Sequence, residues 1–282
     1  MRTRRRTRHR GLARTGGVYD AAMTLTAESV AAASNAWVWV PDNATVVEDE
    51  QYKIARLPDY FEYQLTVLEF RPSGPLGGAV DAVLGRARAF GLPKVRWEVR
   101  LDSPPGLPAQ LTARGATLEA TIDVLACDLR AGAPALPPAA ADVKIRWATD
   151  FETSRDGSAV GVTGFGGALP PDDRIESNAA RDAATVPAGQ GGMLVAYVNG
   201  LPTGSGGVTL VDGVARLWGG VVVPSARGQG VYRAVLDARL SYAAAHGATM
   251  ALVKGKIDTS GPILRRAGFA AYGREPSYDV PL

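Results

Sequence analysis

The chain has 282 residues, of which 46% are hydrophobic and 21% charged, an ordinary composition for a globular protein. At roughly 150 residues per domain, this length favours two domains. A single cysteine, Cys127, excludes an intrachain disulfide and every multi-cysteine metal motif, and two histidines exclude a zinc site built from several imidazoles. No apolar run approaches the roughly 18 residues of a membrane span, so we expect no membrane segment.

The positive charge is concentrated at the N-terminus. The net charge is +3, but residues 1–22 hold seven arginines and one acidic residue, so the remaining residues carry a net charge of −3. A basic run can bind nucleic acid, but the acidic body argues against this, because binding to phosphate needs many cationic contacts. We expect residues 1–22 to be a disordered, dispensable tail, or to precede a true translation start at Met23. With no targeting segment and no disulfide, the expected compartment is the cytoplasm.

A stretch rich in alanine and proline divides the chain into two halves. Residues 131–142 read A-G-A-P-A-L-P-P-A-A-A-D. Three prolines keep such a stretch extended and prevent it from forming a core helix or strand. We interpret it as a linker between a domain over 24–130 and a domain over 143–282.

The second half alternates helix and strand signals in an order that excludes a Rossmann unit. The expected elements are a strand over 143–147, helices over 150–160 and 171–185, strands over 193–199, 203–211 and 214–223, a helix to about 245, a strand over 249–254, a helix over 260–267 and the final strands. Asp150 and Asp172 are expected helix caps, and the glycine-rich residues 161–167 an intervening loop. Asn199-Gly200 and Asp212-Gly213 are typical of two-residue hairpins, which predicts an antiparallel meander.

The two halves repeat one another at matched intervals. The matched positions are Arg71, Gly74, Gly91 and Gly115 in the first half, and Arg227, Gly230, Gly247 and Gly268 in the second. In each half a predicted helix ends at the third matched position, 20 residues after the arginine: Gly91 after Arg71, and Gly247 after Arg227. A strand and a short helix follow in each half. We infer two copies of one α/β module, the first shortened at its start.

The segment with the clearest chemical character is V-V-V-P-S-A-R-G-Q-G-V-Y, residues 221–232. A strand ends, a loop with two glycines turns, and a helix begins. Backbone N–H groups and the helix dipole at such a turn favour a phosphate, and Arg227 can add a charge-assisted contact. Gly219 and Gly220 inside the preceding strand indicate a bulge or the close approach of a ligand. The alternative is a tight strand-to-helix turn that binds nothing.

With these elements in this order, residues 143–282 resemble the GNAT N-acetyltransferase superfamily. R-G-Q-G-V-Y, residues 227–232, is similar to that superfamily's acetyl-CoA signature, with Tyr232 in place of the usual final Gly or Ala. The resemblance implies a tandem GNAT protein of the α/β (α+β) class, in which each copy is a mixed, largely antiparallel sheet flanked by helices. It also implies transfer of an acetyl group from acetyl-CoA to an amine acceptor.

The resemblance further implies roles for individual residues. Backbone groups of Val221 and Val223 would pair with the pantetheine arm, and a backbone amide of the same strand would stabilise the oxyanion. The residues implied to hold the pyrophosphate are Arg227, Gly228, Gln229, Gly230, Val231 and Tyr232. In the first copy, Pro72 and Pro75 remove two N–H donors from the matching loop, so we expect no coenzyme there.

The second copy departs from the GNAT pattern at its catalytic positions. Leu264 stands where many members have a tyrosine general acid, and Asp258 where an asparagine is usual. The remaining candidates are Glu176, Tyr232 and Tyr272, each with an alternative role as a solvated or packing side chain. These departures support a second hypothesis, a non-catalytic protein that binds coenzyme A as a sensor or scaffold.

Overall fold

The structure, a computed structural model, describes residues 25–139 and 142–282. The expected tail over residues 1–22 and the alternative start at Met23 lie outside the described residues. Within the described ranges, no helix is both long and apolar enough to cross a membrane.

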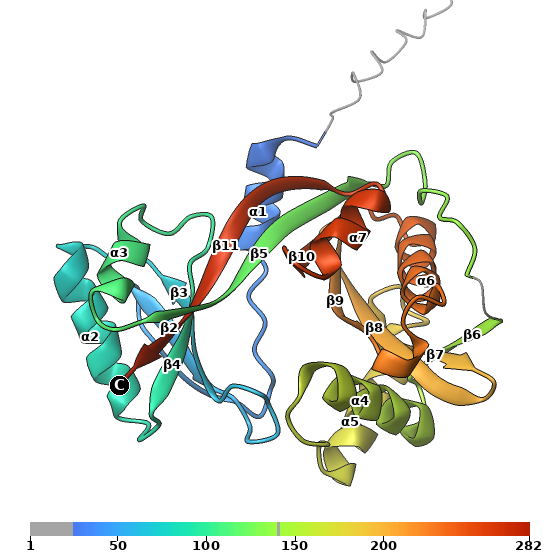
Figure 1. The fold of residues 1–282 in the computed structure, drawn as a ribbon, viewed down its shortest axis with the longest axis horizontal. Coiled ribbons are helices and arrows are strands. Elements are labelled where there is room, and N and C mark those ends of the chain that lie inside the picture. Colours follow the sequence, from blue (N-terminus) through green and yellow to red (C-terminus); the bar gives the residue numbers. More distant parts are fainter. Residues whose placement is uncertain (1–24, 140–141) are drawn as a thin grey trace, which may run out of the picture.

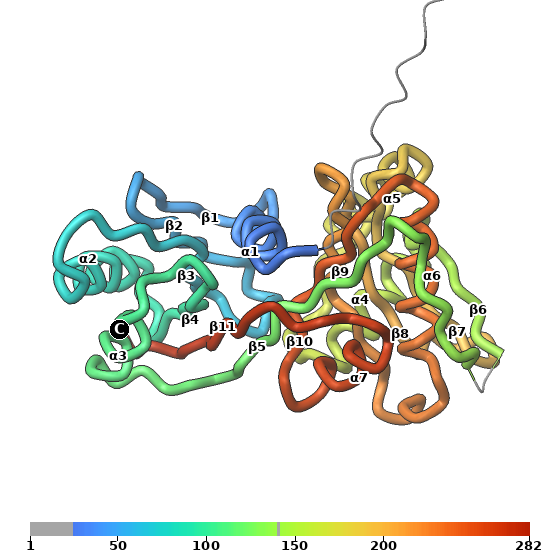
Figure 2. Tube along the Cα trace, turned by 90° about the horizontal axis from the view of Figure 1, so that it is seen from above, coloured from blue at the N-terminus to red at the C-terminus, as the bar shows by residue number. Residues whose placement is uncertain are grey.

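Both halves contribute to a single sheet of eleven strands, with helices on its two faces (Figures 1 and 2). The first half contains α1 (Ala27–Asn35), β1 (Thr45–Glu48), β2 (Tyr52–Arg56), β3 (Leu65–Phe70), α2 (Leu76–Arg88), β4 (Lys94–Glu98), α3 (Leu107–Thr112) and β5 (Thr117–Asp128). The second half contains β6 (Val143–Trp147), α4 (Phe151–Phe165), α5 (Asp172–Thr185), β7 (Gly191–Val198), β8 (Leu201–Val211), β9 (Val214–Val222), the 3-10 turn η1 (Pro224–Ala226), α6 (Val231–Ala245), β10 (Met250–Lys256), α7 (Ser260–Arg266) and β11 (Ala270–Pro281).

The two halves exchange their last strands. The order across the sheet is β1-β2-β3-β4-β11-β5-β10-β9-β8-β7-β6, so β11 pairs with β4 of the first half and β5 pairs with β10 of the second. Figure 2 shows β5 and β11 running side by side between the halves, and the C-terminus lies in the first half, near α3. The division into domains over 24–130 and 143–282 stays a prediction, and the sheet itself is continuous across it.

Buried charges cross the seam between the halves. Asp123 of β5 is 2% exposed and accepts hydrogen bonds from Arg265 at 2.7 Å and Arg274 at 3.4 Å. Glu275 of β11, also 2% exposed, pairs with Lys254 at 2.6 Å and accepts a hydrogen bond from Ser34 of α1 at 3.3 Å. A carboxylate removed from water must be compensated in this way, so these contacts fix how the halves join.

The internal repeat is confirmed in three dimensions. Its four closing glycines, Gly91, Gly115, Gly247 and Gly268, all have positive φ, the conformation in which glycine ends a helix without strain. The helix of the first copy, α2, buries Val80, Val83, Leu84 and Ala87 against the sheet. Cys127 lies buried in β5, as its alternating strand predicts.

The predicted meander is confirmed, and the predicted loop over 161–167 is wrong for most of its length. Both hairpin dipeptides have positive φ at both positions, as type I′ turns require. Helix α4 continues to Phe165, through Gly161 and Gly164. A Cβ on Gly164 would lie 1.9 Å from the side chain of Val221, so the glycine lets the helix pack directly on β9. Close packing outweighs the roughly 1 kcal/mol that a glycine costs inside a helix.

Candidate functional site

The parallel strands β9 and β10 pair over only part of their length. Val214–Leu217 are matched with Met250–Val253, and the next residues of β9 have no partner on β10. We call the segment from Trp218 to Val222 the β9 edge. A strand edge of this kind presents backbone N–H and C=O groups to which an extended ligand can pair.

The register of β8 and β9 decides which groups face away from β8. The N–H of Val223 donates to the C=O of Thr203 on β8 at 2.9 Å. Because successive residues of a strand direct their backbone groups to opposite sides, Val221 and Val223 face β8 and Val222 faces the β9 edge. The expectation that backbone groups of Val221 and Val223 pair with the pantetheine arm is therefore corrected, since both residues direct these groups to β8 inside the sheet.

A bulge in β9 directs a second amide to the same edge. The register shifts between Ser205 and Gly207 of β8, which places both Gly219 and Gly220 opposite Gly206. Counting from the type I′ turn, Trp218 forms a hydrogen-bonded pair with Gly207, so its C=O faces β8. Because the peptide bond is trans, the N–H of Gly219 points the other way, to the β9 edge. The bulge predicted at Gly219-Gly220 is confirmed.

The loop after β9 leads directly into the N-terminus of α6. Gly228 and Gly230 have φ values of 79° and 84°, which non-glycine residues rarely adopt. Gly230 is the N-cap of α6, and no side chain forms a capping hydrogen bond there. Unsatisfied N–H groups and the positive end of the helix dipole are suited to an anion. Nearby, the exposed Arg227 donates through Nε to the C=O of Val222 at 3.3 Å.

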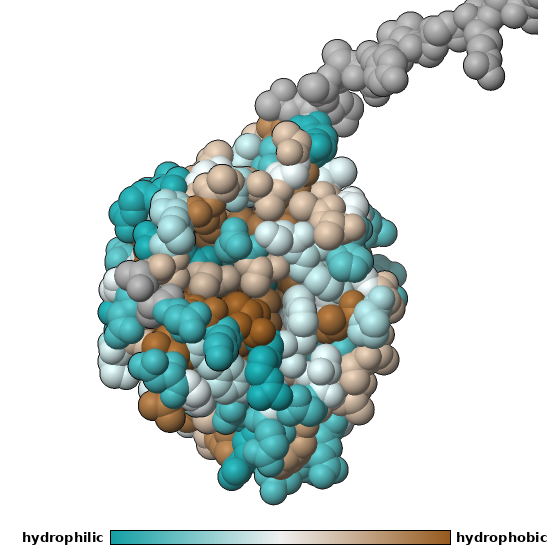
Figure 3. All heavy atoms as spheres, turned by 90° about the vertical axis from the view of Figure 1, so that its right-hand side faces the viewer, coloured by the Kyte–Doolittle hydropathy of each residue, from teal (hydrophilic) through white to brown (hydrophobic). Residues whose placement is uncertain are grey.

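The segment between β5 and β6 lies against this helix end. A Cβ on Gly230 would approach the Cα of Ala139 to 2.8 Å, and Arg233 donates to the C=O of Pro138 at 3.2 Å. A hollow of about 320 Å³ is lined by residues of this segment and of α6. Figure 3 shows the side of the molecule on which α6 and β6 lie, where apolar residues gather and hydrophilic residues surround them. A substitution at Gly230 would therefore disturb both the turn and this segment.

The first copy has the same strand geometry, but one of its own side chains occupies the strand edge. Its parallel strands β3 and β4 pair only at Thr66–Arg96 and Val67–Trp97, and a bulge at Leu68 follows at once. We call residues 68–70 the β3 edge. Here Arg100, whose side chain is 7% exposed, donates to the C=O of Leu68 at 3.2 Å. The same guanidinium also donates to the C=O of Asn35, so it is held in place from both sides.

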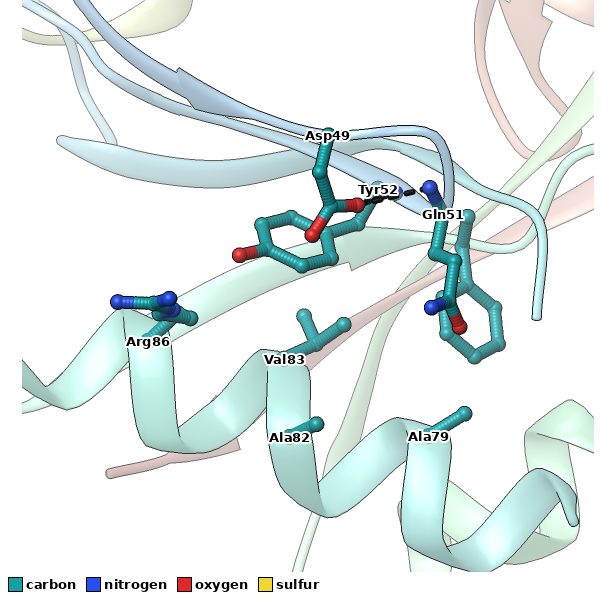
Figure 4. A pocket seen from close by; sticks show the side chains of 8 residues that line it. Asp49, Gln51, Tyr52, Ala79, Ala82, Val83 and Arg86 are labelled. Carbon is teal, nitrogen blue, oxygen red and sulfur yellow. Dashed lines mark hydrogen bonds between the residues drawn. The ribbon is translucent and has the colours of Figure 1, made fainter. Parts of the chain in front are cut away.

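The loop of the first copy has fewer N–H donors than the loop of the second. Pro72 and Pro75 have no N–H, and the N–H of Ser73 is directed at the side chain of Gln51 at 3.4 Å. A neighbouring hollow of about 200 Å³ lies between α2 and the turn before β2 (Figure 4). In it, Asp49 accepts hydrogen bonds from the N–H groups of Gln51 and Tyr52, so its carboxylate stabilises the chain's own turn.

Comparison with known proteins identifies the fold. No protein-family model and no curated protein sequence matches the chain. Among solved structures, it is similar to a GCN5-related N-acetyltransferase from Kribbella flavida, with a TM-score of 0.64 and 18% identity over 93% of this chain and 97% of that one. A GCN5-related N-acetyltransferase from Sphaerobacter thermophilus gives a TM-score of 0.63 and 19% identity over 82% and 76% of the two chains.

A third similar structure decides the arrangement of the copies. It is a tandem GNAT protein from the clavulanic acid biosynthesis pathway, with a TM-score of 0.57 and 19% identity over 90% of this chain and 87% of that one. The chain has a tandem GNAT fold. Its class is α/β, a mixed and mostly antiparallel sheet flanked by helices, as the sequence predicts.

Within the tandem GNAT fold, the catalytic candidates occupy very different places. Tyr232 lies in the first turn of α6, and its ring is 3.2 Å from the position that a Cβ on Gly220 would take, beside the bulge. Tyr272 packs on the α1 face, and β5 and β10 separate its strand from β9. Glu176 is exposed on α5. Of the three, the structure brings only Tyr232 to the bulge.

The positions that depart from the GNAT sequence pattern are structurally unremarkable. Leu264 is fully buried, and its side chain lies 2.9 Å from the position of a Cβ on Gly255. Asp258 is exposed in the turn after β10. Neither presents a proton donor to the β9 edge.

A further residue at the bulge, Arg239 of α6, was not predicted from the sequence. It is 1% exposed, and its guanidinium lies over Gly206 and Gly220. Burial lowers the pKa of Arg239, and the nearby Tyr232 partly opposes this effect. The helical spacing places Arg239 on the buried face of α6, with Val235 and Leu236, so an arginine at a core position was the available signal.

Proposed function

We propose that the protein is an acyl-CoA-dependent N-acetyltransferase that transfers the acetyl group of acetyl-CoA to an amine. The observation that carries the proposal is one juxtaposition. The unpaired β9 edge, with amides of Gly219 and Val222 directed to it, leads through two positive-φ glycines to an uncapped helix N-terminus. An extended thioester with a pyrophosphate at one end needs both features, a strand edge for its arm and an anion site for its phosphates.

The roles of the residues follow from this placement. Amides of Gly228, Gln229, Gly230, Val231 and Tyr232 would surround the pyrophosphate, and Arg227 would swing from Val222 to a phosphate oxygen. Val222 would pair with the pantetheine arm. Val221 and Val223 would keep Val222 in register through their own pairing with β8. The exposed position of Arg227 and the uncapped end of α6 support these assignments.

The reaction needs little from the protein beyond positioning and charge stabilisation. The lone pair of the amine forms a bond to the thioester carbon, and the carbonyl oxygen gains negative charge next to the Gly219 N–H. The carbon–sulfur bond then breaks, the thiolate leaves with the electron pair, and the attacking nitrogen loses a proton to solvent to give the neutral amide. Because a thiol has a pKa of about 8.5, the thiolate leaves without a dedicated acid, which is consistent with Leu264 at the usual tyrosine position.

The test is acetyl-CoA binding by calorimetry, followed by release of free thiol in the presence of a panel of amines. We expect one site per chain and amine-dependent thiol release. Absence of acetyl-CoA binding would contradict the proposal. If acetyl-CoA binds but no amine causes thiol release, the result would favour the second candidate, a coenzyme A sensor or scaffold. Two observations support that candidate: the buried Leu264 at the usual tyrosine position, and the segment that lies against Gly230.

A further inference from the structure

Arg239 is a buried cation without a carboxylate partner among the described residues. Its three hydrogen bonds all go to backbone carbonyl oxygens, those of Val235, Gly207 and Trp218. Its Nη2 has no hydrogen-bond partner within the described part of the chain. Removing a guanidinium from water is unfavourable, and three carbonyl contacts with no counter-charge offset only part of this cost, so the placement needs an explanation.

The two longer bonds of Arg239 converge on the last regular pair of the β8–β9 ladder. Nη1 lies 3.4 Å from the C=O of Gly207 and 3.4 Å from the C=O of Trp218, the two residues matched immediately before the bulge. Trp218 and Gly219 share one peptide group. A donor that holds the C=O of Trp218 therefore also holds the N–H of Gly219, which points the opposite way, to the β9 edge.

The glycines around the guanidinium make this contact possible. A Cβ on Gly220 would lie 3.2 Å from Nη2, and a Cβ on Gly206 would lie 3.1 Å from Nη1. Glycine on both strands thus leaves room for the arginine between α6 and the sheet. Gly219, with a φ of 60°, and Gly220 give the bulge more conformational freedom than other residues would. A contact from Arg239 therefore adds to the ladder pairing with Gly207 in holding the Trp218–Gly219 peptide in one orientation.

The first copy shows that the fold does not require an arginine here. Val83 occupies the matching position of α2, nine residues after Gly74 and eight before Gly91, as Arg239 is nine after Gly230 and eight before Gly247. Val83 is 1% exposed in a copy that has its own bulge at Leu68. An apolar side chain therefore serves the packing role, and the arginine is specific to the copy with the open edge.

We propose that Arg239 is a positioning residue that fixes the Trp218–Gly219 peptide, so that the Gly219 N–H stays directed at the reacting carbonyl. The inference rests on the proposed function, because it gives this amide the oxyanion's position. Arg239 itself stays behind the strand, with β9 between it and the thioester. Without Arg239, the glycine bulge samples other orientations. The transition state then loses the hydrogen bond from the Gly219 N–H, a bond that contributes little in the ground state.

The test compares Arg239→Val, the side chain of the first copy, with Arg239→Lys. We expect kcat of Arg239→Val to fall about 100-fold, the typical effect of losing one oxyanion donor, with KM for acetyl-CoA within about 2-fold of the unchanged protein. Arg239→Lys keeps a cation that can reach one carbonyl, and should recover part of kcat. Equal kcat in folded Arg239→Val, or a loss confined to KM, would overturn the inference.

A second measurement does not depend on turnover. In protein labelled with ¹⁵N-glycine, the Gly219 amide signal should shift more with acetyl-CoA than with coenzyme A. This difference should disappear in Arg239→Val and become smaller in Arg239→Lys. Gly219→Asn, which tolerates positive φ, assigns the signal by its loss. If Arg239→Val does not fold, the lysine variant alone decides: an unchanged shift difference overturns the inference. No acetyl-CoA binding by the unchanged protein would instead contradict the proposed function.

Discussion

The β3 edge and the β9 edge are two versions of one structure in the same chain. Each follows a short parallel pairing, each has a bulge with one extra residue, and each leads into the helix of its copy. At the β3 edge, the buried Arg100 occupies the C=O of Leu68. At the β9 edge, the exposed Arg227 donates to the C=O of Val222, which lies beyond the bulge.

The difference indicates that this strand geometry is not sufficient for the proposed coenzyme site. The first copy keeps the strand geometry but fills its edge with a buried guanidinium and replaces loop donors with prolines. The second copy keeps its donors and adds Arg239 behind the bulge. We infer that the first copy stabilises the sheet and that the second binds acetyl-CoA.

Separating the copies should have the largest effect. A protein restricted to residues 143–282 lacks β5, which is the partner of β10 and of β11. We expect it to show no cooperative thermal unfolding by circular dichroism and to aggregate, because long unpaired strand edges associate. Residues 1–139 and 142–282 expressed together should instead copurify as a folded pair. Cooperative unfolding of residues 143–282 alone, as a monomer, would contradict the strand exchange.

The glycine loop should show the next largest effect. Gly228→Ala forces a side chain into positive φ, and Gly247→Ala does the same at the other end of α6; neither Cβ would touch another residue. Both substitutions should therefore cost about 1 kcal/mol of unfolding free energy. Only Gly228→Ala should weaken acetyl-CoA binding, by about 10- to 100-fold, since a lost hydrogen bond to a charged group is worth about 1.5–3 kcal/mol. Calorimetric titration of both variants would reject the loop assignment if their affinities matched.

Emptying the β3 edge should reduce stability without creating a site. Arg100→Met leaves the carbonyl oxygens of Leu68 and Asn35 without this donor, which should lower the unfolding free energy by about 3 kcal/mol in urea titrations. The stoichiometry of acetyl-CoA binding should stay at one, because Pro72 and Pro75 still lack N–H groups. A second site in this variant would show that Arg100 alone closes the first copy.

The smallest expected effect concerns the end of β11 in the first half. Burial acts to raise the pKa of Asp279, but hydrogen bonds from Arg96 and Lys94 outweigh it and the pKa is lowered. The charged carboxylate therefore stabilises the folded protein at neutral pH, and this contribution is lost as the pH falls through the lowered pKa. Asp279→Asn should cost about 1 kcal/mol at pH 7. Urea unfolding at about pH 3 should show a smaller difference, and an equal or larger one would reject the ion pair.

Local backbone features were predictable from the sequence, and the pairing of strands from the two halves was not. Hairpin dipeptides, the helix-closing glycines and the bulge at Gly219-Gly220 each depend on backbone conformations that few residues adopt, so the residue types themselves indicate them. The exchange of β5 and β11 leaves no such signal, because an alternating strand has the same pattern whichever strand it pairs with. Sequence therefore predicted two modules and not their shared sheet.

Two errors have specific physical causes. Gly161 and Gly164 predicted a loop, but α4 needs Gly164 to approach Val221, and tertiary packing outweighs helix propensity. Val221 and Val223 were expected to face the ligand because the GNAT resemblance implied it. Their direction depends on the bulge, since one extra residue reverses the side to which every later residue of β9 points.

The most direct test of the account is the stoichiometry of acetyl-CoA binding to the full chain, measured by isothermal titration calorimetry with Gly228→Ala and Arg100→Met alongside. We expect one site per chain, with weaker affinity in Gly228→Ala and the same stoichiometry in Arg100→Met. Two equivalent sites, or one site that survives Gly228→Ala at full affinity, would contradict the assignment of acetyl-CoA to the β9 edge.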